Sequence, residues 1–148
     1  PVPMARDIFR FHRISPATMH RPERNPEFIE FWNAILEDTQ IDILMPQDCI
    51  GNCCSHLEEI PAQWQAWRKI ADENKMKLWS HTELFERRSF YEPVNLYPAS
   101  PRRVAAQLAL TAPYAERHCC WEALHFASAD AGGEGVILQK YLQSGKIT

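Results

Sequence analysis

The chain has 148 residues, of which 45% are apolar and 24% charged, and its formal net charge is −3. This length predicts a single domain, residues 1–148, with a core that needs neither disulfide bonds nor metal. The balanced charge does not indicate nucleic acid or a membrane as a partner, and no apolar run approaches the roughly 20 residues of a membrane helix. Five cysteines, an odd number, and no evident signal peptide predict a cytoplasmic protein with reduced thiols, or a periplasmic or secreted one if an N-terminal part precedes this sequence.

The first half of the chain alternates between strand-like and helix-like apolar patterns. Residues 7–14 alternate apolar and polar positions, which predicts a strand. Asn25 followed by Pro26 is a typical helix start, and apolar residues at helical spacing continue this helix to about residue 38. The short apolar run 41–48 then predicts a buried strand of a parallel sheet.

The second half of the chain repeats this order. Pro61 predicts the start of a second helix, and residues 75–86 predict the third strand. A polar, aromatic loop at 87–99 leads to Ser100 and Pro101, which predict the start of a third helix. The remaining predictions are a strand at 116–126, a flexible turn at 129–135 and a short closing helix.

Helices that alternate with apolar strands predict an α/β fold with parallel βα repeats. The predicted βα units are residues 7–38, 41–73, 76–112 and 116–145. Parallel strands present their functional groups at their C-terminal ends, so polar residues there would face one crevice. Each predicted strand does end in such residues: His12, Arg13 and Ser15; Gln47 and Asp48; His81 and Glu83; Glu122 and His125.

Three segments resemble a bacterial domain-of-unknown-function family of glycoside-hydrolase-like TIM barrels. They are IDILMPQDCIG (41–51), KMKLWSHTELFE (75–86) and RVAAQLALTAPYAERHCCWEALHF (103–126). The resemblance covers about residues 7–130 and implies carbohydrate-directed chemistry and half of a (β/α)8 TIM-like barrel, the C-terminal half. A full barrel takes about 250 residues and eight strands, so a homodimer or a missing N-terminal half would complete it.

The resemblance also implies roles for individual residues. Glu83 and Glu122 take the family's acid positions at the strand ends, and Cys49 stands where the family has a glycine after Gln-Asp. Glycoside hydrolysis uses two carboxylates, so we expect Glu122 and Glu83 as the catalytic pair, with carbohydrate as the partner and no cofactor. The expected substrate-binding residues are Gln47, Asp48, Trp79, His81, Tyr91, Trp121 and His125.

The residues leave other interpretations open. Each glutamate could form an ion pair or be solvated, and Asp48 could cap the backbone of its loop. The missing strands motivate a first alternative, a non-catalytic half-barrel that mediates interaction or regulation and is completed by a partner chain. A metal-binding protein would use the cysteines and histidines of 49–56 and 118–120, but their spacing matches no zinc signature and we expect no metal.

Overall fold

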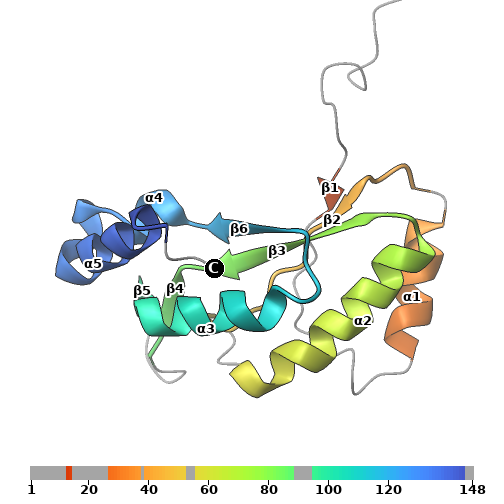
Figure 1. The fold of residues 1–148 in the computed structure, drawn as a ribbon, viewed down its shortest axis with the longest axis horizontal. Helices are drawn as coiled ribbons and strands as arrows, with labels where there is room; N and C mark the ends of the chain where they lie inside the picture. The colour runs from red at the N-terminus through yellow and green to blue at the C-terminus, as the bar shows by residue number, and fades with distance from the viewer. Residues whose placement is uncertain (1–12, 15–26, 38, 53–55, 89–94, 146–148) are drawn as a thin grey trace, which may run out of the picture.

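A computed structural model describes residues 13–14, 27–37, 39–52, 56–88 and 95–145 (Figure 1). Four parallel strands form its main sheet in the order β1-β2-β3-β6, which confirms an α/β fold with parallel strands. These strands are β1 (Arg13–Ile14), β2 (Ile43–Leu44), β3 (Lys77–Glu83) and β6 (Arg117–Trp121). The predicted strand residues 7–12 and the predicted helix start at Asn25-Pro26 lie outside the described residues.

The register of the sheet brings the strand ends together at one edge. Gln47, beyond β2, forms a parallel bridge with His81 of β3. At the end of β3, Glu83 is the register partner of Trp121, the last residue of β6. Because the strands are parallel, the residues that follow them all lie at this C-terminal edge.

Three helices cover one face of the sheet (Figure 1). They are α1 (Glu27–Leu36), α2 (Ile60–Glu73), which follows the 3-10 turn η3 (Leu57–Glu59), and α3 (Pro101–Thr111). Along β3, Leu78, Ser80 and Thr82 are buried, whereas the alternating Trp79 and His81 are only partly buried. Leu78 shares a core cluster with residues of α2, so the buried set faces the helices, and none of the described helices lies over the opposite face.

Local sequence signals explain where the helices begin. Pro61 occupies the first turn of α2 and Pro101 the first turn of α3, as predicted. The Ser100 side chain caps α3 by accepting a hydrogen bond from the Arg103 backbone N–H at 3.2 Å. This bond satisfies one of the backbone donors that a helix start leaves unpaired.

The predicted loop 87–99 is partly wrong. Its beginning and end belong to an antiparallel hairpin of β4 (Phe85–Arg87) and β5 (Leu96–Pro98). Each of these strands has only three residues, too few for an alternating pattern to stand out in the sequence. Residues 89–94, which include Tyr91, lie outside the described residues.

The predicted strand 116–126 and the predicted turn 129–135 are also wrong in part. The strand β6 ends at Trp121 because Glu122 adopts a left-handed backbone with φ 65°, and α4 (Ala123–Phe126) follows. The presumed turn contains η4 (Ala129–Ala131) and the first residues of α5 (Gly132–Gln143). Gly135 is required there because a Cβ would lie 2.4 Å from the Ser128 carbonyl oxygen.

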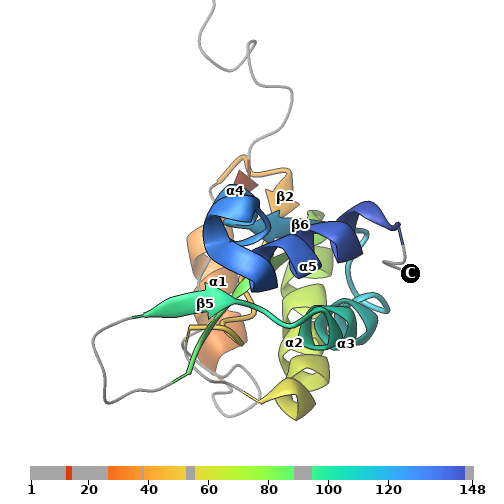
Figure 2. The same cartoon turned by 90° about the vertical axis from the view of Figure 1, so that its left-hand side faces the viewer.

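The two last helices lie beyond the C-terminal edge of the sheet. Figure 2, which views the molecule from this side, shows α4 and α5 in front of the strands. A second core cluster there joins Leu138 of α5 to Val104 and Leu108 of α3 and to Leu84. Among the described residues, none of the helices combines the length and apolar character needed to cross a membrane.

Candidate functional site

Glu83 is one of two deeply buried carboxyl residues among the predicted site residues at this edge. Its side chain is 1% exposed, and its Oε2 atom accepts hydrogen bonds from the backbone N–H groups of Gly51 at 2.8 Å and Asn52 at 2.9 Å. Burial raises the pKa of Glu83, while these two donors and the positive charge of Arg103 act in the opposite direction. The carboxyl group therefore fixes the loop that follows β2.

Asp48 lies in the same enclosed region and is also 1% exposed. Its Oδ1 accepts from the Ile50 backbone N–H at 3.3 Å, so the loop-capping role is present. Its Oδ2 accepts from Gln107 Nε2 at 2.6 Å. Burial, followed by the negative charge of Glu83, raises the pKa of Asp48 to about 7, against the bonds from Ile50 and Gln107.

Two residues of α3 that the sequence analysis missed connect these strand ends. Arg103 donates from Nη2 to the carbonyl oxygens of Glu83 at 2.9 Å and Phe85 at 2.7 Å. From Nη1 it donates to Oε1 of Gln107, the residue that holds Asp48. The only sequence signal was a polar pair four residues apart, a spacing that places both side chains on the helix face that also carries the buried Val104, Leu108 and Thr111.

A line of aromatic rings runs along the edge beside the carboxylates. The ring of Trp121 lies 5.7 Å from that of His81 and 5.9 Å from that of Phe85, measured between centroids. Phe85 in turn lies 5.1 Å from Phe126 of α4. Trp79 lies two residues before His81 on the same face of β3. The Arg117 guanidinium carbon lies 5.7 Å from the centroid of the Trp79 ring. The predicted His81 and Trp121 are therefore brought together, and Trp79 lies on the same face of β3, which the described helices leave open.

Glu122 differs from Glu83 in both exposure and backbone. Its side chain is 31% exposed and is hydrogen-bonded to Nδ1 of His125, which is 77% exposed. Its left-handed backbone is costly for a residue with a side chain, by about 1–2 kcal/mol. Cys49, directly after Asp48, has the same kind of backbone with φ 54°, a conformation that glycine adopts more readily than cysteine. Glu122 immediately follows β6, and Cys49 lies two residues after Gln47, which bridges to β3.

The cysteines do not assemble a metal site within the part of the chain that the structure describes. Cys49, Cys119 and Cys120 carry thiols, and no group of three or more histidine, cysteine, aspartate or glutamate side chains is placed to hold an ion. Cys119 and Cys120 are successive residues of β6, so their side chains leave the strand on opposite faces. Cys53 and Cys54 lie outside the described residues.

The fold and the edge define a class of protein: an α/β chain whose parallel strands end in carboxylates, imidazoles and aromatic rings. A family model described as "Domain of unknown function (DUF4434)" matches residues 10–131, and the chain belongs to this family. No curated protein matches the sequence.

A solved structure shows the same fold. It is that of a "putative alpha-L-fucosidase" from Bacteroides thetaiotaomicron VPI-5482, with a TM-score of 0.68 and 20% sequence identity. The match covers 92% of this chain and 45% of the other chain, so this chain spans less than half the length of that protein. At this identity the likeness concerns the fold.

Proposed function

We propose that this chain is a glycan-directed protein that resembles a glycoside hydrolase and binds or cleaves a carbohydrate at the C-terminal edge of its sheet. The observation that carries the proposal is the register of β3 with β6. Glu83 is the register partner of Trp121, and Glu122 follows Trp121 in the chain, so both neighbouring strands end in a carboxylate beside an aromatic ring. Glycosidases use such a carboxylate pair, and aromatic rings stack on the apolar faces of sugars.

In this proposal the two glutamates have different roles. Glu122, the more exposed of the two, meets the ligand with His125 as its hydrogen-bonded partner. Glu83 is the second carboxyl group, and its raised pKa suits a group that must carry a proton. Trp79, His81 and Trp121 form the adjoining surface, and Tyr91 is a further predicted contact. Asp48 and Gln47 support the loop and strand beneath this surface.

The proposal includes the barrel geometry. Four parallel strands with helices on one face are half of what an eight-stranded barrel contains. We therefore propose that the face bearing Trp79 and Trp121 is the barrel interior. A second copy of the chain or an additional N-terminal half would supply the remaining strands. The cytoplasmic location and the single domain at 1–148 stay predictions.

The test is hydrolysis of p-nitrophenyl glycosides, beginning with the α-L-fucoside because the similar structure carries that name. Glu83→Gln and Glu122→Gln should each lower kcat at least 100-fold, as expected for loss of a catalytic carboxylate. Glu116→Gln is the matched control, since Glu116 precedes β6 at the opposite edge of the sheet. Equal turnover by all three variants and the parent would remove the catalytic assignment.

A non-catalytic interaction module is a second candidate, and the burial of Glu83 favours it. A carboxyl group that is 1% exposed and occupied by two backbone donors is well suited to holding a loop. Under this alternative the chain binds a glycan or a partner without turnover. Glycan binding by calorimetry, combined with no hydrolysis of any glycoside in the panel, would select it.

A further inference from the structure

Two neighbouring cavities form a groove beside the hairpin, separate from the proposed carboxylate pair. One has a volume of about 230 Å³ and lies between the end of β5, the start of α3 and α5. The other, about 510 Å³, lies between the loop after β2, the turn η3 and β4. Glu86 and Arg88 line both cavities, so the two adjoin at these residues, and we call them together the hairpin groove. Neither cavity is lined by Glu83 or Glu122.

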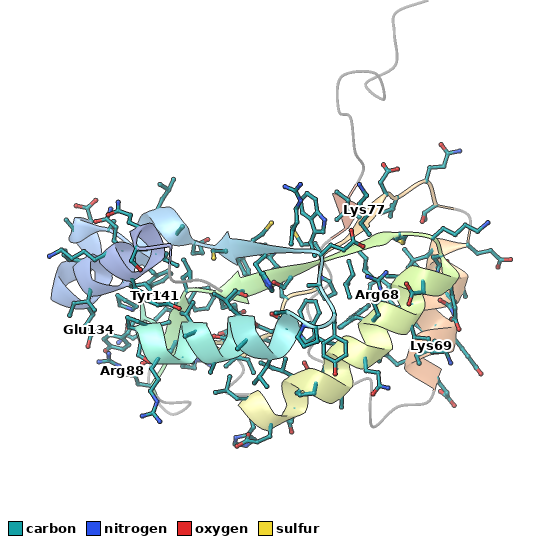
Figure 3. All side chains as sticks on the ribbon, in the orientation of Figure 1. Arg68, Lys69, Lys77, Arg88, Glu134 and Tyr141 are labelled. Carbon is teal, nitrogen blue, oxygen red and sulfur yellow. The ribbon has the colours of Figure 1, made fainter. Side chains whose placement is uncertain are left out.

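The Glu86 carboxylate and the Arg88 guanidinium lie where the two cavities of the hairpin groove adjoin, and each is held by neighbouring charged groups. Arg88 Nη2 lies 2.9 Å from Oε1 and 2.8 Å from Oε2 of Glu134, and Figure 3 shows these two side chains at the same end of the molecule. The Arg88 guanidinium also lies 4.2 Å above the ring of Tyr97. Glu86 is held between Arg88 Nε at 3.8 Å and Arg103 Nε at 3.6 Å and stays 29% exposed.

The walls of the groove are apolar on either side of these charges. Pro98, Pro101 and the 59% exposed Ile137 form one wall, and Ile50 and Leu57 belong to the other cavity. Fully apolar ligands would leave the central charges without hydration, which costs free energy. A sugar chain presents apolar ring faces and, at its edges, hydroxyl groups that both donate and accept, so it matches the walls and the charged pair together.

We propose that the hairpin groove binds a neutral oligosaccharide in an extended form, with Glu86 and Arg88 contacting adjacent hydroxyl groups. The larger cavity lies within the range of about 300–1,000 Å³ that is typical of ligand sites. The groove also borders Ile50 and Gly51, and Gly51 donates to Glu83. This inference rests on the glycan-directed part of the proposed function and not on the carboxylate pair. It specifies that the ligand is longer than one sugar and extends beside the β2 loop.

The experiment is isothermal titration calorimetry of the chain with a panel of neutral linear hexasaccharides and the monosaccharides that compose them. Arg88→Met and Glu86→Gln should each raise the Kd of a binding hexasaccharide about tenfold. Ile137→Glu, which changes a wall at an exposed position, should do the same without disturbing the core. Lys69→Met is the control, because Lys69 lies on α2 at the other end of the molecule (Figure 3). Circular dichroism establishes that each variant is folded.

The outcomes separate this inference from the strand-end proposal. Loss of affinity in the groove variants would support the hairpin groove. If Trp121→Ala and Glu122→Gln then keep their affinity, the strand-end site is rejected; if they also lose it, one ligand occupies both sites. Loss only in the latter pair would overturn the hairpin groove. A panel with no binding hexasaccharide overturns it as well, as does a hexasaccharide whose Kd is unchanged in all three groove variants.

Discussion

Replacing Asp48 with asparagine should change how the stability of the protein depends on pH. Asp48 is 1% exposed, and its pKa is raised from an ordinary value of 3.8 to about 7, first by burial and then by the charge of Glu83. In the unfolded chain the carboxyl group is hydrated and ionises near its ordinary pKa. Between these two values the native state therefore binds more protons at this site than the unfolded state does.

The sign and size of the effect follow from this difference. The contribution of Asp48 to stability is fully present below pH 3.8 and is lost as the pH rises to about 7. At 1.36 kcal/mol for each pKa unit, the loss amounts to about 4 kcal/mol. The asparagine cannot ionise, so it avoids this loss. Its amide nitrogen cannot accept from Ile50 or Gln107, however, and one lost hydrogen bond costs about 1.5 kcal/mol.

The two contributions predict that the stability curves cross. Asp48→Asn should be less stable than the parent by about 1 kcal/mol at pH 4, equal near about pH 5 and more stable by about 3 kcal/mol at pH 8. Urea unfolding at a series of pH values measures this, with fluorescence of the buried Trp64 and Trp67 as the signal. Asp130→Asn, at an exposed position of η4, is the control. A stability difference that is the same at pH 5 and pH 8 would refute the reasoning.

Three further variants test local backbone features. Gly51→Ala should lower the free energy of unfolding by about 3 kcal/mol because its Cβ would lie 1.9 Å from the Phe85 carbonyl oxygen, which forces the loop away from Glu83. Gly133→Ala, in α5 with open space around the new Cβ, should instead stabilise the protein by about 0.5–1 kcal/mol. Thermal unfolding measures both variants, and a similar loss of stability in both would contradict the argument. Ser100→Ala should cost about 1 kcal/mol in urea unfolding through loss of the α3 cap, and an unchanged midpoint would show that the cap contributes nothing.

The parts of the fold that the sequence predicted correctly are set by neighbouring residues. Pro61 and the Ser100-Pro101 pair mark helix starts because their effect on the backbone is local. The wrong assignment after Trp121 arose because Ala-Leu-His-Phe satisfies a strand pattern and a helix pattern equally over so short a length. There the left-handed backbone of Glu122 decides the outcome, and glutamate gives no sign of it.

The site was predictable to a similar extent. The parallel order of the strands placed Gln47, His81 and Glu83 at one edge without any knowledge of contacts. By contrast, the bond between Gln107 and Asp48 joins residues 59 positions apart and depends on how α3 lies against the sheet. Exposure also depends on packing. Glu83 is buried and Glu122 is partly exposed at neighbouring strand ends, and the sequence alone does not distinguish the two glutamates.

The burial of Glu83 determines which substitution can separate chemistry from structure at this edge. Alanine would remove the oxygen that accepts from Gly51 and Asn52, so the loop would lose its support along with any catalytic carboxyl group. Glutamine keeps one oxygen that can accept both bonds and removes only the ionisable group. If Glu83→Gln lowers turnover but leaves the free energy of unfolding unchanged, Glu83 therefore acts in catalysis. If only Glu83→Ala lowers the free energy of unfolding, and turnover does not depend on the ionisable group, Glu83 serves to hold the loop. The comparison of the two variants thus distinguishes a hydrolase from a binding module built on the same sheet.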